Sequence, residues 1–215
     1  MELTRAAIFD LDGTLVLTEE RNRVVWQRFF TAYDIDLTDQ IARQLTGRRG
    51  PDALRELTHL FPGRDPQDLF AEVLAHELAD DLPAITAVPG GADLVRALGE
   101  AGVPLALVTS ASGHQVTQRL DSIGVGGCFD VVVTGADVSV GKPDPEGFTR
   151  AGDLLGVPPS RCVGFEDSPA GVAAVKAAGM VCVAVTTTFD AEVLRAADVI
   201  VPDLTEFPWP VAEVA

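Results

Sequence analysis

Short apolar runs alternate with amphipathic segments along much of this chain, and this alternation restricts the fold more than any other feature. Each run has the length and composition of a buried strand. The expected strands cover residues 6–9, 104–108, 130–134, 161–165, 180–185 and 198–201. Strands that alternate with helices build a parallel, doubly wound sheet with right-handed crossovers. We therefore expect an α/β fold, in a chain of 215 residues that is long enough to bury a real core.

One stretch breaks this alternation, because residues 19–82 carry helical patterns and no strand signal. Thr38 can cap one helix in this stretch, and Pro51 can open the next. Asp65, which is followed by proline, starts a further helix. Short breaks that contain glycine or proline separate the helices, and this spacing is typical of a compact helical bundle.

The position of the helical stretch predicts two domains. An α/β core would comprise residues 1–16 and 84–215, and an inserted α-helical cap would comprise residues 17–83. The hinges that join the two domains should lie near residues 15–18 and 82–88.

Composition excludes several kinds of partner. The chain has 32 acidic and 16 basic residues and a formal net charge of −16, which would repel nucleic acid. No apolar stretch approaches the length of a membrane span, and the N-terminus lacks the order of a signal peptide. Cys128, Cys162 and Cys182 lie far apart without the spacing of metal ligands, which favours a reduced, cytoplasmic location. The sequence indicates no oligomeric state.

Two aspartates, Asp10 and Asp12, follow the first expected strand. Alternation along extended backbone aims both side chains the same way, at the end of the sheet where ligands bind in α/β folds. Two carboxylates this close are costly unless a cation or a reacting group offsets them. An ordinary acidic turn is the alternative. A calcium loop fits less well, because Gly13 and Thr14 stand where further oxygen ligands should be.

Three later segments should bring complementary groups to the same edge. Thr109 and Ser110 end one strand, Lys142 lies between Gly141 and Pro143, and Glu166 and Asp167 end another strand. Each segment alone is also a common structural pattern, namely a helix cap, a solvated turn and a helix start. Their coincidence at successive strand ends is what predicts a site.

The combined side chains favour phosphoryl transfer. Several carboxylates and hydroxyls suit a magnesium ion, while Lys142 and the backbone amides after Thr109 could hold a phosphoryl group. One aspartate can then attack phosphorus, and its neighbour can protonate the leaving oxygen and later activate water. Lys142 is one of only two lysines in the chain, which favours a site that needs a compact ammonium group.

These motifs resemble the haloacid dehalogenase-like (HAD) superfamily, in its helical-cap branch of sugar-phosphate phosphatases and β-phosphoglucomutase-like proteins. The resemblance covers nearly the whole chain, and the motifs come in the family's order. The matching segments are Asp10-Leu-Asp12-Gly-Thr-Leu, Leu107-Val-Thr109-Ser110, Gly141-Lys142-Pro143-Asp-Pro and Gly164-Phe-Glu166-Asp167-Ser. The resemblance implies a Rossmann-like α/β core with an inserted helical cap.

The resemblance also implies a role for each matching residue. Asp10 would be the nucleophile that becomes an aspartyl phosphate, and Asp12 would be the general acid and base. Thr109 would bind the phosphoryl oxygens, with the Ser110 amide beside it. Lys142 would offset the negative charge of both Asp10 and the phosphate.

The family's magnesium ion would be held by four residues of this chain. Asp10 and Asp167 would ligate the ion directly, Asp12 would give its backbone carbonyl, and Glu166 would belong to the same cluster. The metal and Lys142 would together supply the electrostatic stabilisation on which phosphoryl transfer depends. Mg²⁺ is therefore the expected cofactor.

The helical cap should act as a lid that excludes water and selects the leaving group. Arg48 and Arg49, in a loop between two helices, are candidates for contacts with phosphate or sugar hydroxyls, although a basic surface loop is an equal alternative. Asn22 could face the substrate from the first cap helix. The mutases of the family carry a histidine at that position, so Asn22 favours hydrolysis. Leu17 replaces an acidic residue that is common in this branch.

We expect a magnesium-dependent phosphatase that acts on a small phosphorylated metabolite, most readily a sugar phosphate. A phosphosugar mutase and a phosphoglycolate phosphatase are alternatives with the same fold. A dehalogenase is disfavoured because Asp12 supplies a second acid. A non-catalytic module that binds a phosphorylated metabolite is an alternative of another class, and the loss of Asp10, Asp12 or Lys142 would have indicated it. The expected partner is thus a small molecule, and neither nucleic acid nor a membrane.

Overall fold

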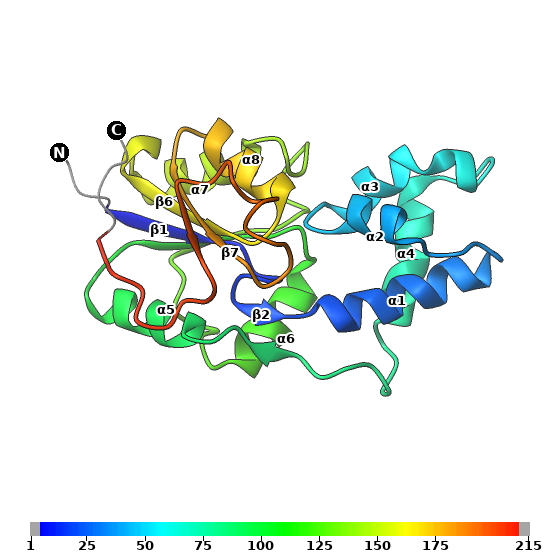
Figure 1. Ribbon diagram of the computed structural model, residues 1–215, viewed down its shortest axis with the longest axis horizontal. Coiled ribbons are helices and arrows are strands. Elements are labelled where there is room, and N and C mark those ends of the chain that lie inside the picture. The colour runs from blue at the N-terminus through cyan, green and yellow to red at the C-terminus, as the bar shows by residue number, and fades with distance from the viewer. Residues whose placement is uncertain (1–4, 211–215) are drawn as a thin grey trace.

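A parallel sheet forms the centre of the computed structural model, which describes residues 5–210 (Figure 1). Within these residues the sheet has six strands, in the order β5-β4-β1-β6-β7-β8. Their bounds are Ala6–Phe9 for β1, Leu105–Val108 for β4, Val131–Val133 for β5, Cys162–Glu166 for β6, Val181–Val185 for β7 and Val199–Val201 for β8. Every neighbouring pair is parallel, which confirms the expected doubly wound α/β fold. The first residues, for which the sequence predicted no signal peptide, lie outside the described range.

Helices cover both faces of this sheet, and strand β1 shows why. Its side chains alternate, so Ala7 and Phe9 lie in one apolar cluster while Ala6 and Ile8 lie in another. The first cluster takes its helical side chains from α5 and α6, and the second takes them from α7 and α8 (Figure 1). These helices span Gly91–Glu100 for α5, Gly113–Ser122 for α6, Glu146–Leu155 for α7 and Pro169–Ala177 for α8.

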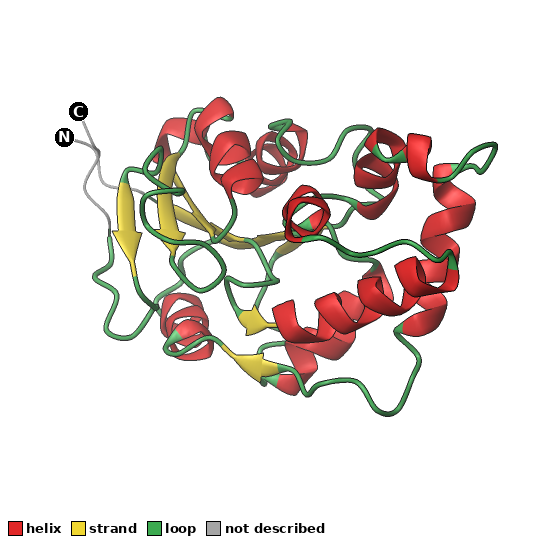
Figure 2. Cartoon of the chain, turned by 45° about the vertical axis from the view of Figure 1, so that its right-hand side comes forward, coloured by secondary structure: helices red, strands yellow, loops and turns green. Residues whose placement is uncertain are grey.

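Apart from the short 3-10 helix η2 (Pro159–Arg161), which precedes β6, the remaining helices form a separate group beside the sheet, with a core of their own (Figures 1 and 2). They are α1 (Glu19–Ala32), α2 (Asp39–Leu45), α3 (Gly50–Glu56), the short 3-10 helix η1 (Thr58–Leu60) and α4 (Pro66–His76). Thr38 and Asp65 cap α2 and α4, since their side chains accept bonds from backbone amides. Phe29, Phe30 and Phe61 pack at the centre of this helical group, with ring centroids 5.4 to 5.7 Å apart. We call residues 17–83 the cap, and these bounds stay a prediction.

A small antiparallel sheet joins the chain segments that enter and leave the cap. Strand β2 (Val16–Leu17) pairs with β3 (Thr86–Ala87), and both are visible in Figure 2. The backbone amide of Val88 also donates to the carbonyl of Leu15 at 2.9 Å. The two chain segments that connect the core with the cap therefore lie side by side at the expected hinges. Strands of two residues are too short to give a periodic pattern in a sequence.

Within residues 5–210, no helix combines the length and the apolar character that crossing a bilayer would need. Cys128, Cys162 and Cys182 are all free thiols, as their separation in the sequence suggested.

Candidate active site

Three of the four motifs meet because β4, β1 and β6 are adjacent in the sheet and run the same way. Asp10 comes directly after β1, Thr109 comes directly after β4, and β6 ends at Glu166 with Asp167 following. The backbone amide of Asp10 donates to the carbonyl of Phe165 at 3.0 Å, which fixes the first carboxylate beside the third strand end. All these polar side chains are buried. The topology has therefore gathered the groups that the sequence spreads over more than 150 residues.

Lys142 is the cation of this cluster. It lies between β5 and α7, and its Nζ is 2.5 Å from Asp10 Oδ1 and 2.5 Å from Glu166 Oε1. Nζ also donates to the carbonyl of Val108 at 3.3 Å. Burial alone would lower the pKa of Lys142, but the two adjacent carboxylates raise it, so the ammonium stays charged.

Burial has the opposite consequence for the aspartates. Burial raises the pKa of Asp10 to about 7. Lys142 opposes this rise, whereas the negative charges of Glu166 and Asp12 add to it. Burial and the charges of Glu166 and Asp10 also raise the pKa of Asp167 well above its ordinary value. The cluster therefore holds more negative charge than Lys142 alone can offset, and it favours a second cation.

Glu166 is held rigidly by the start of α8. Its Oε2 accepts hydrogen bonds from the amides of Asp167 and Ser168, at 3.0 and 3.1 Å, and from the Ser168 hydroxyl at 3.0 Å. Its Oε1 accepts from Lys142. With both oxygens occupied, Glu166 orients Lys142 and adds negative charge to the cluster.

The carboxylates fit a magnesium ion. Asp10, Glu166 and Asp167 each offer an oxygen, and these oxygens lie within 4.8 Å of one another. Asp167 Oδ2 is buried and has no hydrogen-bond partner, which is costly unless a cation binds there. Gly13 leaves room for this carboxylate, since a Cβ at that position would lie 1.8 Å from Asp167 Oδ2. Hard carboxylate oxygens, one of which is unpartnered, are the environment that Mg²⁺ prefers.

The Asp12 carboxylate faces away from this group. Its Oδ1 accepts from the Thr18 hydroxyl at 2.6 Å, and its Oδ2 accepts from an Arg119 nitrogen at 2.5 Å. Only the backbone carbonyl of Asp12 is thus left to serve an ion, as the resemblance implied. Sequence reasoning missed Arg119. The available signal was a pair of polar residues, Gln115 and Arg119, spaced four apart on the buried side of α6.

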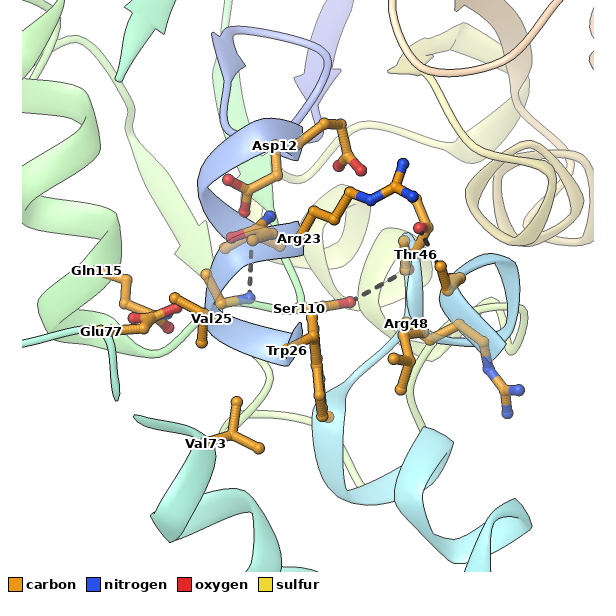
Figure 3. Close-up of a pocket in the computed structure, with 18 of the residues that line it drawn as sticks. Asp12, Arg23, Val25, Trp26, Thr46, Arg48, Val73, Glu77, Ser110 and Gln115 are labelled. Atoms are coloured by element: carbon orange, nitrogen blue, oxygen red, sulfur yellow. Dashed lines mark hydrogen bonds between the residues drawn. The ribbon is translucent and has the colours of Figure 1, made fainter. Parts of the chain in front are cut away.

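A cavity of about 130 Å³ opens above the aspartates, between core and cap. Asp10, Asp12, Thr109 and Ser110 line its core end. The cap supplies a mixed wall, part of which is labelled in Figure 3. Its apolar members are Val25, Trp26, Leu37, Ala42, Leu45, Phe70 and Val73, and its polar members are Glu19, Asn22, Arg23, Thr46, Arg48 and Glu77. The cavity therefore offers polar and apolar contacts on its cap side, which suits a phosphorylated molecule with both hydroxyl groups and some apolar surface.

The three cap residues expected at the substrate lie in different places. Arg48 and Asn22 line the cavity, and the Arg48 guanidinium pairs at 2.7 Å with Glu56, which is not part of the cavity wall. Arg49 is not part of the cavity wall and instead reaches the core. Its guanidinium donates to the carbonyls of Gly135 at 3.0 Å and Val138 at 2.8 Å. In this structure Arg49 therefore docks the cap onto the core, and its expected contact with the substrate stays a prediction.

The docked cap loop also packs against the core next to Ser110. The Ser110 hydroxyl donates to the carbonyl of Gly47 at 3.4 Å, which is drawn in Figure 3. Gly47 has a φ of 73°, and a Cβ there would lie 2.4 Å from the Ser168 hydroxyl oxygen. Only glycine allows this close approach, so the loop covers the end of the sheet tightly.

Comparison with known proteins agrees with this geometry. The model of the haloacid dehalogenase-like hydrolase family matches residues 4–179. Validoxylamine A 7'-phosphate phosphatase of Streptomyces hygroscopicus subsp. limoneus is 43% identical over 206 residues, which cover 96% of this chain and 97% of the relative. Hexitol phosphatase A of Escherichia coli K12 is 33% identical, over 93% of this chain and 91% of the relative.

A solved structure of a related protein has the same fold. CbbY from Rhodobacter sphaeroides, in complex with xylulose-(1,5)bisphosphate, matches this structure with a TM-score of 0.82 at 28% identity. The match covers 94% of this chain and 96% of that one. The chain belongs to the haloacid dehalogenase-like hydrolases, which confirms the family and the enzyme class that its motifs predicted.

Proposed function

We propose that this enzyme is a magnesium-dependent phosphatase that hydrolyses a sugar phosphate or a similar phosphorylated polyol through an aspartyl phosphate. The observation that carries the proposal is the placement of Asp10 beside Lys142 and the unpartnered Asp167 oxygen, at the floor of a cavity that the cap covers. One phosphatase relative is named for validoxylamine A 7'-phosphate and the other for hexitols, and these names support a phosphorylated sugar or polyol as the substrate.

In the proposed reaction, Asp10 attacks phosphorus while Lys142 balances its charge. Thr109 Oγ1 accepts a hydrogen bond from the Ala111 amide at 3.0 Å, which leaves the hydroxyl proton free to donate to a phosphoryl oxygen. Asp12 protonates the leaving oxygen and then takes a proton from the water that attacks the aspartyl phosphate. A magnesium ion held by Asp10, Asp167 and the Asp12 carbonyl would neutralise charge on the phosphoryl group.

Asn22 supports hydrolysis over phosphosugar mutation. Its amide lines the cavity and donates to the Thr18 hydroxyl at 3.3 Å, and an amide cannot carry a proton as histidine does. The presence of Asp10, Asp12 and Lys142 in one connected site argues against a non-catalytic binding module. The cytoplasmic location stays a prediction.

A panel of hexose, pentose and polyol phosphates tests the function directly. We expect phosphate release that requires magnesium, is abolished by a chelator and favours one of these classes. A coupled assay for isomer interconversion with the same substrates separates hydrolysis from mutation. If no compound releases phosphate in the presence of magnesium while isomers do interconvert, the mutase alternative holds. If neither reaction is detected, the proposed function is rejected for these substrates.

Magnesium binding should depend on pH in a defined direction. The pKa of Asp10 is raised to about 7, so at pH 6 this carboxyl mostly holds a proton that the ion must displace, and the raised pKa of Asp167 acts in the same direction. At pH 8 Asp10 is mostly ionised, its negative charge destabilises the metal-free fold, and the ion relieves this repulsion. We expect 5 mM Mg²⁺ to raise the melting temperature more at pH 8 than at pH 6.

Asp167→Asn is the control for this measurement, because it keeps the shape of the side chain and removes a ligand charge. The variant should lose most of the magnesium-induced shift at pH 8. An equal shift at both pH values, or an unchanged shift in Asp167→Asn, would show that the ion binds elsewhere.

A further inference from the structure

A buried arginine on α6 contacts the acid-base residue of the proposed reaction. Arg119 is 4% exposed, and its guanidinium lies 2.5 Å from Asp12 Oδ2. The two residues are 107 positions apart in the chain, so the contact depends on the fold and not on local structure. A buried arginine is costly unless its charge is paired, and here one of its two carboxylate partners is Asp12.

The second carboxylate partner of Arg119 comes from the cap. Glu77 is the residue that ends α4, and its Oε1 lies 3.7 Å from an Arg119 nitrogen. The Gln115 amide, one helical turn before Arg119, donates to the other Glu77 oxygen (Figure 3). The Gln115 carbonyl oxygen is itself fixed, because it accepts from the Ser112 amide at 2.7 Å in a capping box. The end of α4 is thus bound to α6 through two neighbouring side chains.

Asp12 is therefore oriented from both sides. The Thr18 hydroxyl, at the start of the first cap helix, holds one oxygen, and Arg119 holds the other. The terminal torsion of an aspartate has a broad, roughly two-fold preference, so an unheld carboxylate would rotate. A misplacement of about 1 Å at a reacting group can reduce a rate about 100-fold.

We propose that Arg119 is a positioning residue that holds Asp12 toward the leaving group. Because Arg119 also contacts Glu77, the orientation of Asp12 depends on the cap being docked against the core. This inference rests on the proposed phosphatase function. Arg119 also lines the cavity, and its contact with Asp12 is what assigns it a positioning role. It acts through Asp12, and Glu77 acts through Arg119.

The step that Arg119 supports can be written in full. As an Asp10 oxygen bonds to phosphorus, the bond from phosphorus to the leaving oxygen breaks, and its electron pair stays on that oxygen, which takes the proton of Asp12. The ionised Asp12 then removes a proton from the water whose oxygen bonds to phosphorus, and the bond between phosphorus and Asp10 breaks. Alkyl phosphates need the first proton, whereas p-nitrophenyl phosphate releases a stable phenolate without it.

Steady-state and burst kinetics of Arg119→Gln test the positioning role. We expect kcat for the best sugar phosphate to fall at least about 10-fold with KM changed less than about 3-fold. The pre-steady-state burst of nitrophenolate, which reports transfer to Asp10 without a proton donor, should keep nearly its native rate. Arg119→Lys should recover part of the loss in kcat. Arg96→Gln, which removes an exposed arginine from α5, is the matched control and should behave like the native enzyme.

A double-mutant cycle tests the link to the cap. Glu77→Gln should lower kcat by a smaller factor than Arg119→Gln, and the double variant should be no slower than Arg119→Gln alone. If the double variant loses kcat by the product of the two single factors, Glu77 does not act through Arg119 and the link to the cap is overturned. If Arg119→Gln does not fold, the same kinetic measurements are made on Arg119→Lys and Glu77→Gln, which should both lower kcat while KM and the nitrophenolate burst change little.

Three results would overturn the positioning role. They are an unchanged kcat in Arg119→Gln, a loss confined to KM, and an equal slowing of the nitrophenolate burst. A loss confined to KM would make Arg119 a substrate-binding residue instead. Failure of the proposed function is seen separately, because the native enzyme would then release no phosphate from any member of the panel.

Discussion

Asp10→Asn is expected to abolish phosphate release, with kcat reduced at least about 10⁴-fold. The amide is nearly the same size as the carboxylate but is a poor nucleophile, so no aspartyl phosphate can form. The fold should survive, because burial raises the pKa of Asp10 and so already disfavours its charged form. The amide oxygen can also keep the hydrogen bond that Lys142 donates to Asp10 in the native protein. Phosphate release with the preferred sugar phosphate measures the effect, and thermal unfolding checks the fold.

Asp12→Asn is the matched control for this prediction, since it changes the neighbouring aspartate in the same way. Without a proton donor, it should lose most turnover of sugar phosphates, by about 10² to 10⁴-fold. It should still give a burst of nitrophenolate from p-nitrophenyl phosphate, whereas Asp10→Asn should give none. A burst in Asp10→Asn, in a preparation free of other phosphatases, would assign the nucleophile to another residue.

The strand ends could be predicted because local pattern and topology agree there. The apolar run before Asp10 indicates a buried strand, and parallel strands with helical crossovers bring their carboxyl ends to one edge. The side chains after these strands therefore had to meet, and the structure places Asp10, Thr109 and Asp167 at one edge. Lys142 is not on a strand. Its motif drew attention to it, but its bonds to two carboxylates depend on the path of the loop before α7.

The contacts between core and cap could not be predicted in the same way. They depend on how two bodies dock, and no pattern within either body encodes that geometry. Arg49 resembles a substrate residue in the sequence because arginine suits phosphate, yet it donates to the core carbonyls of Gly135 and Val138. Conversely, Arg119 sits in an ordinary amphipathic helix, and its contacts with Asp12 and with the docked Glu77 show why an arginine is buried there.

The chain contains only two lysines, and they allow a sharp comparison of a buried and an exposed ion pair. Lys142 is buried between Asp10 and Glu166, whereas the Lys176 side chain is 39% exposed and pairs with Asp198 at 2.5 Å. Lys142→Met is expected to abolish phosphatase activity and to lower the free energy of unfolding by about 3–5 kcal/mol, since it leaves buried carboxylates without a cation. Lys176→Met should cost at most about 1 kcal/mol, as exposed pairs do, and should keep native activity.

Urea unfolding of both variants in a chelating buffer measures this difference, because magnesium would otherwise replace part of the lost positive charge. Added magnesium should then restore more stability to Lys142→Met than to Lys176→Met, but it should not restore activity, because the ammonium also balances the charge of Asp10 while Asp10 attacks phosphorus. Equal losses of stability in the two variants would show that the buried cluster does not depend on Lys142. Native activity in Lys142→Met would remove it from the proposed mechanism.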